Sequence, residues 1–250
     1  YGVRDPLGFR PLCVGEVYYD AKKVTGHIIA SESCALSTIG ASYLREVKPG
    51  EIIRIDKDGL HSCFTLQTDR QALCIFEYIY FSRPDTILMD KSVHKIRQNL
   101  GAELALKDDV DGDIVIGVPD SSTPVAVGYA QARGIPFTEG LIKNRYIGRT
   151  FIQPNNKLRR ADVNLKYNSL KVNLCNKRVI LIDDSIVRGN TMGPIVNLIR
   201  EAGATEVHVR IASAPIRFPC FMGIDMSTKK ELIAAQMSEE EICNHIGADS

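Results

Sequence analysis

Two runs of branched apolar residues predict strands that are buried on both faces. Residues 114–119 and 179–182 contain no polar side chain, which is typical of a strand covered on both sides. Each run is followed by a polar loop and then by a helical pattern. This alternation predicts an α/β fold, a parallel sheet with helices on both faces, whose ligands bind beyond the carboxyl ends of the strands.

Helix signals follow both strands. After the first strand, Thr123 suits an N-cap, Pro124 the first helical position and Gly134 the end of the helix. After the second strand, apolar residues recur at helical spacing over residues 195–202, and the pattern stops at Gly203. The same strand–loop–helix unit is therefore predicted twice.

Further elements complete this part of the chain. Apolar residues three and four apart predict a helix over about residues 91–106. Residues 136–142 and 206–212 are predicted strands. Ser238 and Glu241 form a predicted capping box that opens a last helix ending near residue 246.

The first part of the chain has a different pattern, with strands and turns but no long helix. Its predicted strands cover residues 12–19, 27–31, 51–56 and 60–66, the last two joined as a hairpin through residues 57–59. We therefore divide the chain into residues 1–70 and 71–250. For Arg4, Asp5 and Arg10, in the unusual segment 4–12, we expect a structural role in a turn.

The composition is that of an ordinary globular protein. Of 250 residues, 44% are hydrophobic, and the net charge of +1 favours neither nucleic acid nor an anionic membrane as partner. No apolar run approaches the roughly 18 residues of a membrane span. The seven cysteines are dispersed and contain no Cys-x-x-Cys, which favours the reducing cytoplasm. The sequence does not begin with Met, and residues 1–12 look like the middle of a domain, so we expect a longer parent polypeptide.

Two adjacent carboxylates, Asp183 and Asp184, end the second buried strand. A loop with Ser185, Gly189 and Thr191 follows and leads into a helix. Backbone N–H groups and the helix dipole bind anions at such a place, and carboxylates bind hard cations. We predict a phosphate site beside a metal or hydroxyl groups. The alternative is an ordinary solvated turn between a strand and a helix.

A long basic segment lies between the two strand–loop–helix units. Residues 143–171 hold eight basic residues and one acidic residue, a local charge of +7. A loop of this length is usually functional or disordered. We interpret it as a lid that closes over a polyphosphate. Nucleic acid is the alternative ligand, although the segment offers only three aromatic residues to stack bases.

Residues 179–191 resemble the 5-phosphoribosyl-1-pyrophosphate (PRPP) signature of type I phosphoribosyltransferases: four apolar residues, two acids and a loop ending Gly-x-Thr. Four further motifs narrow the resemblance to the amidophosphoribosyltransferase family and extend it over the whole chain. They are residues 4–12, 31–36, 76–85 and 143–152. The resemblance implies a type I phosphoribosyltransferase fold, preceded by the last strands of an Ntn-type glutaminase domain.

The family's reaction is a glycosyl transfer and is the first step of de novo purine biosynthesis. PRPP, glutamine and water give 5-phosphoribosylamine, pyrophosphate and glutamate. In the family an N-terminal cysteine releases ammonia from glutamine. That nucleophile matches no residue of this sequence, so we expect no glutaminase activity from it. Purine nucleotides as feedback ligands, a tetramer and a cytoplasmic location are further implications, without nucleic acid or membrane partners.

The resemblance also assigns site residues. Mg²⁺ is expected at Ser121, Asp183 and Asp184, and the base of the basic loop (Lys143, Arg145 and Tyr146) is expected over the leaving pyrophosphate. The PRPP-binding positions are Ser121, Ser122, Asp183, Asp184, Ser185, Ile186, Val187, Arg188, Gly189, Asn190 and Thr191.

Some members of the family carry a [4Fe-4S] cluster. Two of their cysteine ligands match Cys74 and Cys220, and two more form a Cys-x-x-Cys that this sequence does not contain. Thiolates are the usual ligands of such clusters. A buried small hydrophobe is the alternative role for each of these cysteines.

Two other functions stay open. One is a different type I phosphoribosyltransferase, which would act on a nucleobase. The other is a PRPP-sensing regulator that keeps the signature without catalysis and binds nucleic acid through residues 143–171.

Overall fold

The computed structural model describes residues 1–20, 23–66, 70–146 and 165–250. The chain divides into two compact units, Tyr1–Ile96 and Arg97–Ser250, and each is described by itself. The predicted domain boundary at residues 70 and 71 stays a prediction, because it adjoins residues outside the described ranges.

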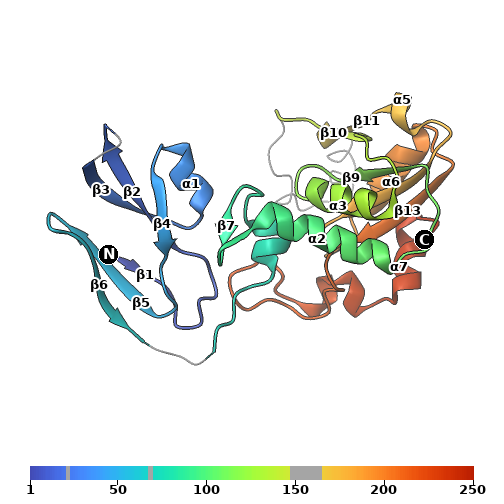
Figure 1. Cartoon of the computed structure of the whole chain (residues 1–250). Helices are drawn as coiled ribbons and strands as arrows, with labels where there is room; N and C mark the ends of the chain where they lie inside the picture. The colour runs from blue at the N-terminus through green and yellow to red at the C-terminus, as the bar shows by residue number, and fades with distance from the viewer. Residues whose placement is uncertain (21–22, 67–69, 147–164) are drawn as a thin grey trace. The chain divides into compact units, whose positions relative to one another are not determined.

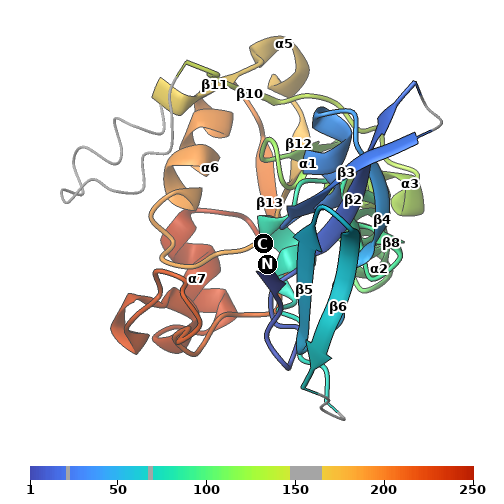
Figure 2. The same ribbon diagram turned by 90° about the vertical axis from the view of Figure 1, so that its left-hand side faces the viewer.

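The first unit contains two three-stranded antiparallel sheets (Figure 2). One has the order β1 (Gly2–Val3), β5 (Glu51–Asp56), β6 (Gly59–Thr65), and the other β3 (Lys23–Ala30), β2 (Cys13–Tyr19), β4 (Ser42–Glu46). Val14, Val47 and Ile53 are fully buried in one core cluster to which both sheets contribute. The predicted hairpin is confirmed, with Asp56 paired to Gly59. The pattern missed α1 (Ser33–Thr38) and β4.

Shorter elements end this unit. A π-helical turn covers Glu77–Phe81, and a two-stranded hairpin follows, β7 (Ile87–Leu88) with β8 (Lys91–Ser92).

The segment 4–12 is structural, as predicted. Arg4 is buried, and its guanidinium donates to the carbonyl oxygens of Arg10 (3.0 Å) and Val47 (2.6 Å). Both carboxylate oxygens of Asp5 accept backbone N–H groups of the following turn. Arg10 pairs with Glu77 at 2.7 Å. These contacts hold an irregular segment in one conformation.

The second unit is built on a parallel sheet with the order β13 (Glu206–Ile211), β12 (Arg178–Asp183), β9 (Ile114–Gly117). Its α-helices within the described residues are the last part of α2 (Val93–Leu106), α3 (Thr123–Arg133), α5 (Lys171–Leu174), α6 (Met192–Glu201) and α7 (Glu239–Ile246), and two 3-10 turns cover Lys229–Glu231 and Ile233–Ala235. The ends of the last helix and its capping box agree with the prediction. In Figure 1, helices lie in front of this sheet and behind it.

Alternate residues of β12 face two different cores. Val179 and Leu181 belong to a cluster with residues of α6 and α7, whereas Ile180 and Ile182 pack with residues of α2 and α3. All four side chains are fully buried. The predicted central strand, covered by helices on both faces, is therefore confirmed.

Two local predictions in this unit are wrong. The N-cap of α3 is Ser122 rather than Thr123, because the Ser122 carbonyl already accepts the N–H of Ala126. The predicted strand 136–142 is reduced to a single bridge from Phe137 to Val115 and to β10 (Leu141–Lys143), which pairs antiparallel with β11 (Tyr167–Ser169). Pro136 has no N–H to donate to a sheet.

Helices α2 and α3 pack with their backbones close together. Gly101 lies against the backbone of α3, where a β-carbon would overlap the Val125 carbonyl oxygen. Gly128 lies against α2, where a β-carbon would overlap the carbonyl oxygen of Gln98. Only glycine permits this approach at both positions.

Asp108 joins the end of α2 to α3 and β13. Its carboxylate accepts hydrogen bonds from Arg210 (2.5 and 2.9 Å) and from the Tyr129 hydroxyl (2.5 Å). Burial opposes ionisation of Asp108, but these bonds and the Val110 N–H outweigh it and lower the pKa to about 2. The Asp108 and Arg210 side chains are only 6% and 16% exposed.

We expect Asp108→Asn to lower the free energy of unfolding at pH 7 by about 3 kcal/mol, because Arg210 then loses its buried counter-charge. The pKa is depressed in the folded chain. Its stabilisation is therefore present above the unfolded value near 4 and is lost as the pH falls towards 2. Urea unfolding at pH 7 and pH 3 should show a smaller difference between parent and variant at pH 3. Asp109→Asn, at an exposed neighbour, is the control and should match the parent at both pH values.

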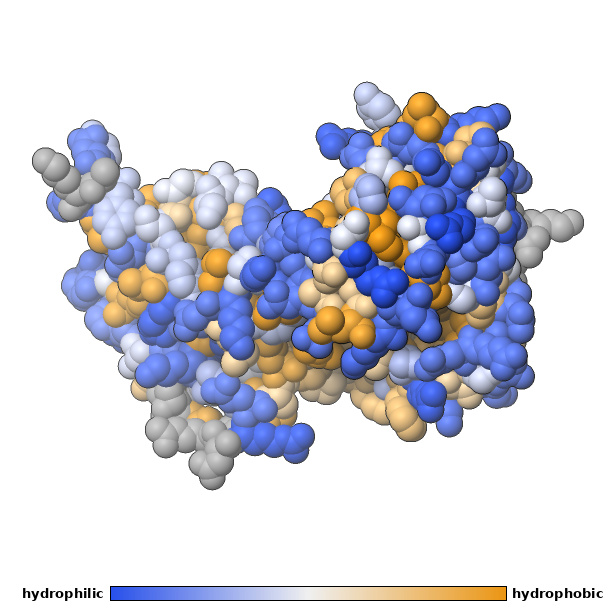
Figure 3. Space-filling view, turned by 45° about the vertical axis from the view of Figure 1, so that its right-hand side comes forward, coloured by the Kyte–Doolittle hydropathy of each residue, from blue (hydrophilic) through white to orange (hydrophobic). Residues whose placement is uncertain are grey.

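The surface is mixed in character. On the face drawn in Figure 3, hydrophilic residues predominate, with apolar residues between them. Within the described ranges, no helix has both the length and the apolar character needed to cross a membrane.

Candidate functional site

The site lies at the carboxyl ends of β9 and β12, which are neighbours in the parallel sheet. The Ser122 hydroxyl donates to Asp183 Oδ1 at 2.7 Å, and the Ser121 hydroxyl donates to Asp184 Oδ2 at 2.5 Å. The structure thus brings together the two polar strand ends that the sequence placed at one edge of the sheet.

The loop after β12 folds around the same carboxylates. The Ser185 hydroxyl donates to Asp184 Oδ1 at 2.6 Å. Gly189 has a φ of +72°, which favours glycine, and Thr191 is the N-cap of α6 without a capping hydrogen bond from its side chain. The loop therefore presents hydroxyl groups and the positive end of α6, an arrangement that favours a bound anion.

The two carboxylates resist ionisation. Burial and then the neighbouring Asp184 raise the pKa of Asp183, against the hydrogen bond from Ser122. Burial also raises the pKa of Asp184, which is 5% exposed, whereas the hydroxyls of Ser121 and Ser185 and the charge of Arg97 lower it. A cation bound beside two adjacent acids would favour the ionised form of both.

The donor set fits Mg²⁺. This ion binds carboxylate oxygens and often takes its other ligands from water and a substrate's phosphates. The described residues contain no group of three or more His, Cys, Asp and Glu that could hold a metal. Asp183 and Asp184 would hold Mg²⁺, with the Ser121 hydroxyl beside them, and a phosphate ligand would have to complete the coordination.

The base of the basic loop is partly described. Lys143 ends β10 and pairs at 2.5 Å with Asp120, the residue that precedes Ser121 in the chain. Tyr146 is almost fully exposed, and Arg145 is also exposed. Residues 147–164 lie outside the described ranges, so the lid stays a prediction.

The other predicted loop residues have different environments. Ile186 packs against the core, and Asn190 is exposed. The Val187 carbonyl oxygen accepts the N–H of Ile233 at 3.0 Å. Arg188 forms an ion pair with Glu231 at 2.6 Å.

Three residues at or around the site were missed by sequence reasoning: Arg97, Glu231 and Ile233. A signal existed for Arg97, because it falls on the apolar stripe of α2 between Val93 and Leu100, where a buried charge requires a partner. No spacing in the sequence links Glu231 or Ile233 to the loop.

The two proposed cluster ligands lie in different units. Cys74 and Cys220 are half-buried free thiols, and Cys220 Sγ accepts the N–H of Met222 at 3.4 Å. The described residues supply no ligand set for a [4Fe-4S] cluster, which needs four ligands. A cluster at Cys74 and Cys220 therefore stays a prediction.

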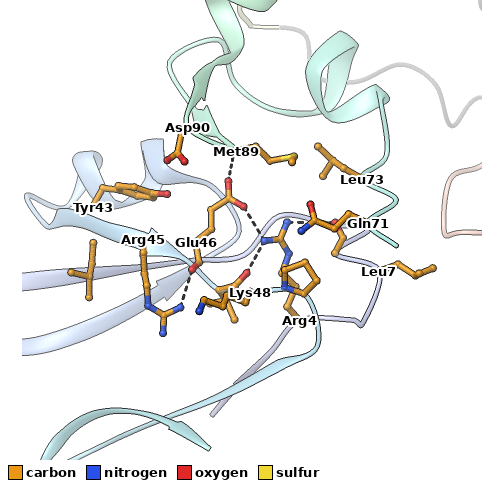
Figure 4. Close-up of a pocket in the computed structure, with 14 residues that line it drawn as sticks. Arg4, Leu7, Tyr43, Arg45, Glu46, Lys48, Gln71, Leu73, Met89 and Asp90 are labelled. Carbon is orange, nitrogen blue, oxygen red and sulfur yellow. Dashed lines mark hydrogen bonds and ion pairs between the residues drawn. The ribbon is translucent and has the colours of Figure 1, made fainter. Parts of the chain in front are cut away.

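A cavity of about 400 Å³ lies in the first unit (Figure 4). Arg4 and Glu46 line it, but their charges are already paired at 2.9 Å, and Arg4 is bonded to backbone carbonyls as well. Unlike the carboxylate pair, these groups need no further ligand.

Comparison with known proteins gives consistent matches. The sequence profile described as "Phosphoribosyl transferase domain" matches residues 90–214. Amidophosphoribosyltransferases from Synechocystis sp. and Homo sapiens are 50% and 47% identical over 100% of this chain, and that from Bacillus subtilis is 52% identical over 98%. The chain spans about half the length of these curated relatives (50%, 51% and 50%).

Solved structures agree with the sequence matches. The glutamine PRPP amidotransferase from B. subtilis complexed with ADP and GMP superposes with a TM-score of 0.86 at 51% identity, covering 98% of this chain and 53% of that one. A structure described as the allosteric regulatory enzyme of purine biosynthesis also gives 0.86, at 50% identity over 98% of this chain and 51% of that one. The predicted phosphoribosyltransferase fold and the family resemblance are confirmed.

Proposed function

The chain belongs to the phosphoribosyltransferase family and is similar over its whole length to amidophosphoribosyltransferases, and from this premise we propose that it binds PRPP and transfers ammonia to C1 of the ribose. The products would be 5-phosphoribosylamine and pyrophosphate. The observation that carries the proposal is the meeting of Ser121 and Ser122 with Asp184 and Asp183 beside a loop that leads into a helix N-terminus.

Each group of PRPP has a counterpart in this site. The 5-phosphate would lie in the loop from Ser185 to Thr191, where backbone N–H groups and the α6 dipole favour an anion. Asp183 and Asp184 would accept hydrogen bonds from the ribose hydroxyls. The hydroxyls of Ser121 and Ser122 would face the pyrophosphate.

The reaction breaks the bond between C1 and the pyrophosphate oxygen and forms a bond from C1 to nitrogen, and the bound ammonia then gives up a proton. Positive charge develops on the sugar and negative charge on the leaving group. Mg²⁺, when bound, would offset the charge of the pyrophosphate. Lys143 and Arg145 would stabilise the same charge as it grows. No side-chain nucleophile is needed.

The release of pyrophosphate tests this proposal. We expect the chain to release pyrophosphate from PRPP and Mg²⁺ when ammonium is added at alkaline pH, and not when adenine, guanine or orotate is added. A coupled pyrophosphate assay measures it. Release with a nucleobase alone would identify a different phosphoribosyltransferase.

The regulator is the second alternative, and the positive charge of residues 143–171 is the observation that favours it. Oligonucleotide binding that weakens steeply with salt would support it. PRPP binding without pyrophosphate release under any of these conditions would point the same way.

The other implications of the family resemblance are proposals for a longer parent protein. They include glutamine as the ammonia source, feedback by purine nucleotides, a tetrameric assembly, a cytoplasmic location and an iron–sulfur cluster that uses Cys74 and Cys220.

A further inference from the structure

Arg188, in the middle of the loop after β12, is held by an acid that lies 43 residues later. Its Nε and Nη2 donate to Glu231 Oε2 at 3.0 and 2.6 Å. Nη2 also donates to the carbonyl oxygen of Asp225 at 2.9 Å. The guanidinium is therefore already engaged by the segment 225–231.

Glu231 is fixed from its other side as well. Its Oε1 accepts hydrogen bonds from the hydroxyls of Thr228 (2.7 Å) and Ser227 (3.3 Å). The hydrogen bond from Thr228 and then that from Arg188 lower the pKa of Glu231. One carboxylate oxygen thus holds the loop while the other is tied to its own segment.

The same segment supports the loop backbone. The N–H of Ile233 donates to the Val187 carbonyl oxygen at 3.0 Å, and a β-carbon on Gly189 would lie 2.5 Å from Ile233 Cδ1. Leu232 and Ile233 are themselves buried in the protein. Residues 225–233, which we call the buttress, therefore contact Val187, Arg188 and Gly189 in succession.

We propose that Glu231 is a positioning residue for the 5-phosphate subsite: through Arg188 it holds the loop in the conformation that binds the phosphate. This inference rests on the proposed function, because it concerns the same PRPP site. It assigns Arg188 an indirect role, in which its backbone faces the ligand and its side chain ties the loop to the buttress. The other end of the site holds Asp183, Asp184, Ser121 and Ser122, whose side-chain hydrogen bonds within the described residues join them to one another and to Ser185.

Two ligands that each correspond to one part of PRPP, called half-ligands below, test the two ends of the site independently. Ribose 5-phosphate carries only the sugar and its phosphate, and magnesium pyrophosphate carries only the leaving group. Calorimetric titration of the chain should show that Glu231→Gln binds ribose 5-phosphate roughly three- to tenfold more weakly, as expected for one partly exposed charged hydrogen bond. Its affinity for magnesium pyrophosphate should not change. In turnover with ammonium, KM for PRPP should rise by the same factor with kcat unchanged.

Glu201→Gln makes the same change of charge at an exposed position at the far end of α6 and should match the parent with both ligands. Arg188→Gln should show the loss seen in Glu231→Gln, and the double variant should be no weaker than either single variant. A much larger loss in Arg188→Gln than in Glu231→Gln would mean that the guanidinium touches the phosphate itself, and would overturn the inference.

Equal weakening of both half-ligands, or unchanged binding of ribose 5-phosphate, would also overturn it. If Glu231→Gln does not fold, Thr228→Val serves instead and should show a smaller loss with the same selectivity. A parent chain that binds neither half-ligand would contradict the proposed function itself, and thereby this inference with it, whereas a defect confined to the variants tests the buttress alone.

Discussion

Replacing either carboxylate of the pair should abolish Mg²⁺-dependent binding of PRPP and leave the fold intact. In Asp183→Asn or Asp184→Asn one hard oxygen ligand is replaced by a neutral amide. We expect the affinity to fall more than about 100-fold, because even changes outside a metal's direct ligands commonly cost roughly 10- to 100-fold. Isothermal titration with PRPP in the presence and absence of Mg²⁺ measures this loss.

Thermal unfolding separates lost binding from lost structure. Burial and Asp184 disfavour the charged form of Asp183 in the folded chain, so a neutral amide at this position costs the fold little near neutral pH. The melting temperature of Asp183→Asn should therefore be close to that of the parent. Asp109→Asn is the matched control and should keep both properties. Binding of PRPP by both carboxylate variants at the parent's affinity would refute the assignment of the site.

Adding a single methyl group between α2 and α3 should destabilise the second unit strongly. In Gly101→Ala or Gly128→Ala the new β-carbon meets a backbone carbonyl oxygen of the facing helix, which cannot move aside as a side chain can. Alanine is favoured over glycine within a helix by about 1 kcal/mol. We nevertheless expect a net loss of about 2–3 kcal/mol, since the helices must separate. Urea unfolding monitored by circular dichroism gives the value.

Gly193→Ala provides the control for this pair. Gly193 lies in α6, where a β-carbon would make only ordinary contacts, the nearest to Ile246 at 3.8 Å. That variant should be as stable as the parent or slightly more stable. Stability equal to the parent in all three variants would show that α2 and α3 have room to adjust.

The parallel core could be predicted from the sequence because burial on both faces leaves a plain signal. The run 179–182 has no polar interruption, and the structure buries all four side chains completely between two layers of helices. The proximity of these two strand ends, where Ser121 and Ser122 donate to Asp184 and Asp183, followed from the rule that ligand-binding loops of a parallel sheet lie at the carboxyl ends of its strands.

Other features depend on tertiary contacts that no local pattern records. The strand 136–142 looked continuous, yet Pro136 lacks an N–H and only Leu141–Lys143 pairs with β11. Glu231 lies in a short polar segment, and its role is visible only once the chain returns to the loop at Arg188. The sequence could predict that Arg97 is a buried charge that needs a partner. It could not predict the partner, because a charge on an apolar stripe does not show which acid it faces.

The hydroxyls that hold the carboxylate pair have a consequence for how a ligand enters. Ser121, Ser122 and Ser185 each donate a hydrogen to Asp183 or Asp184, and each can release it by rotation about one C–O bond. Asp183 and Asp184 would then be free to hold a cation, and the released hydroxyls would be available to donate to a phosphate. The strands need not rearrange for this exchange. Because folding has already ordered these groups, ordering them adds no entropic cost to ligand binding.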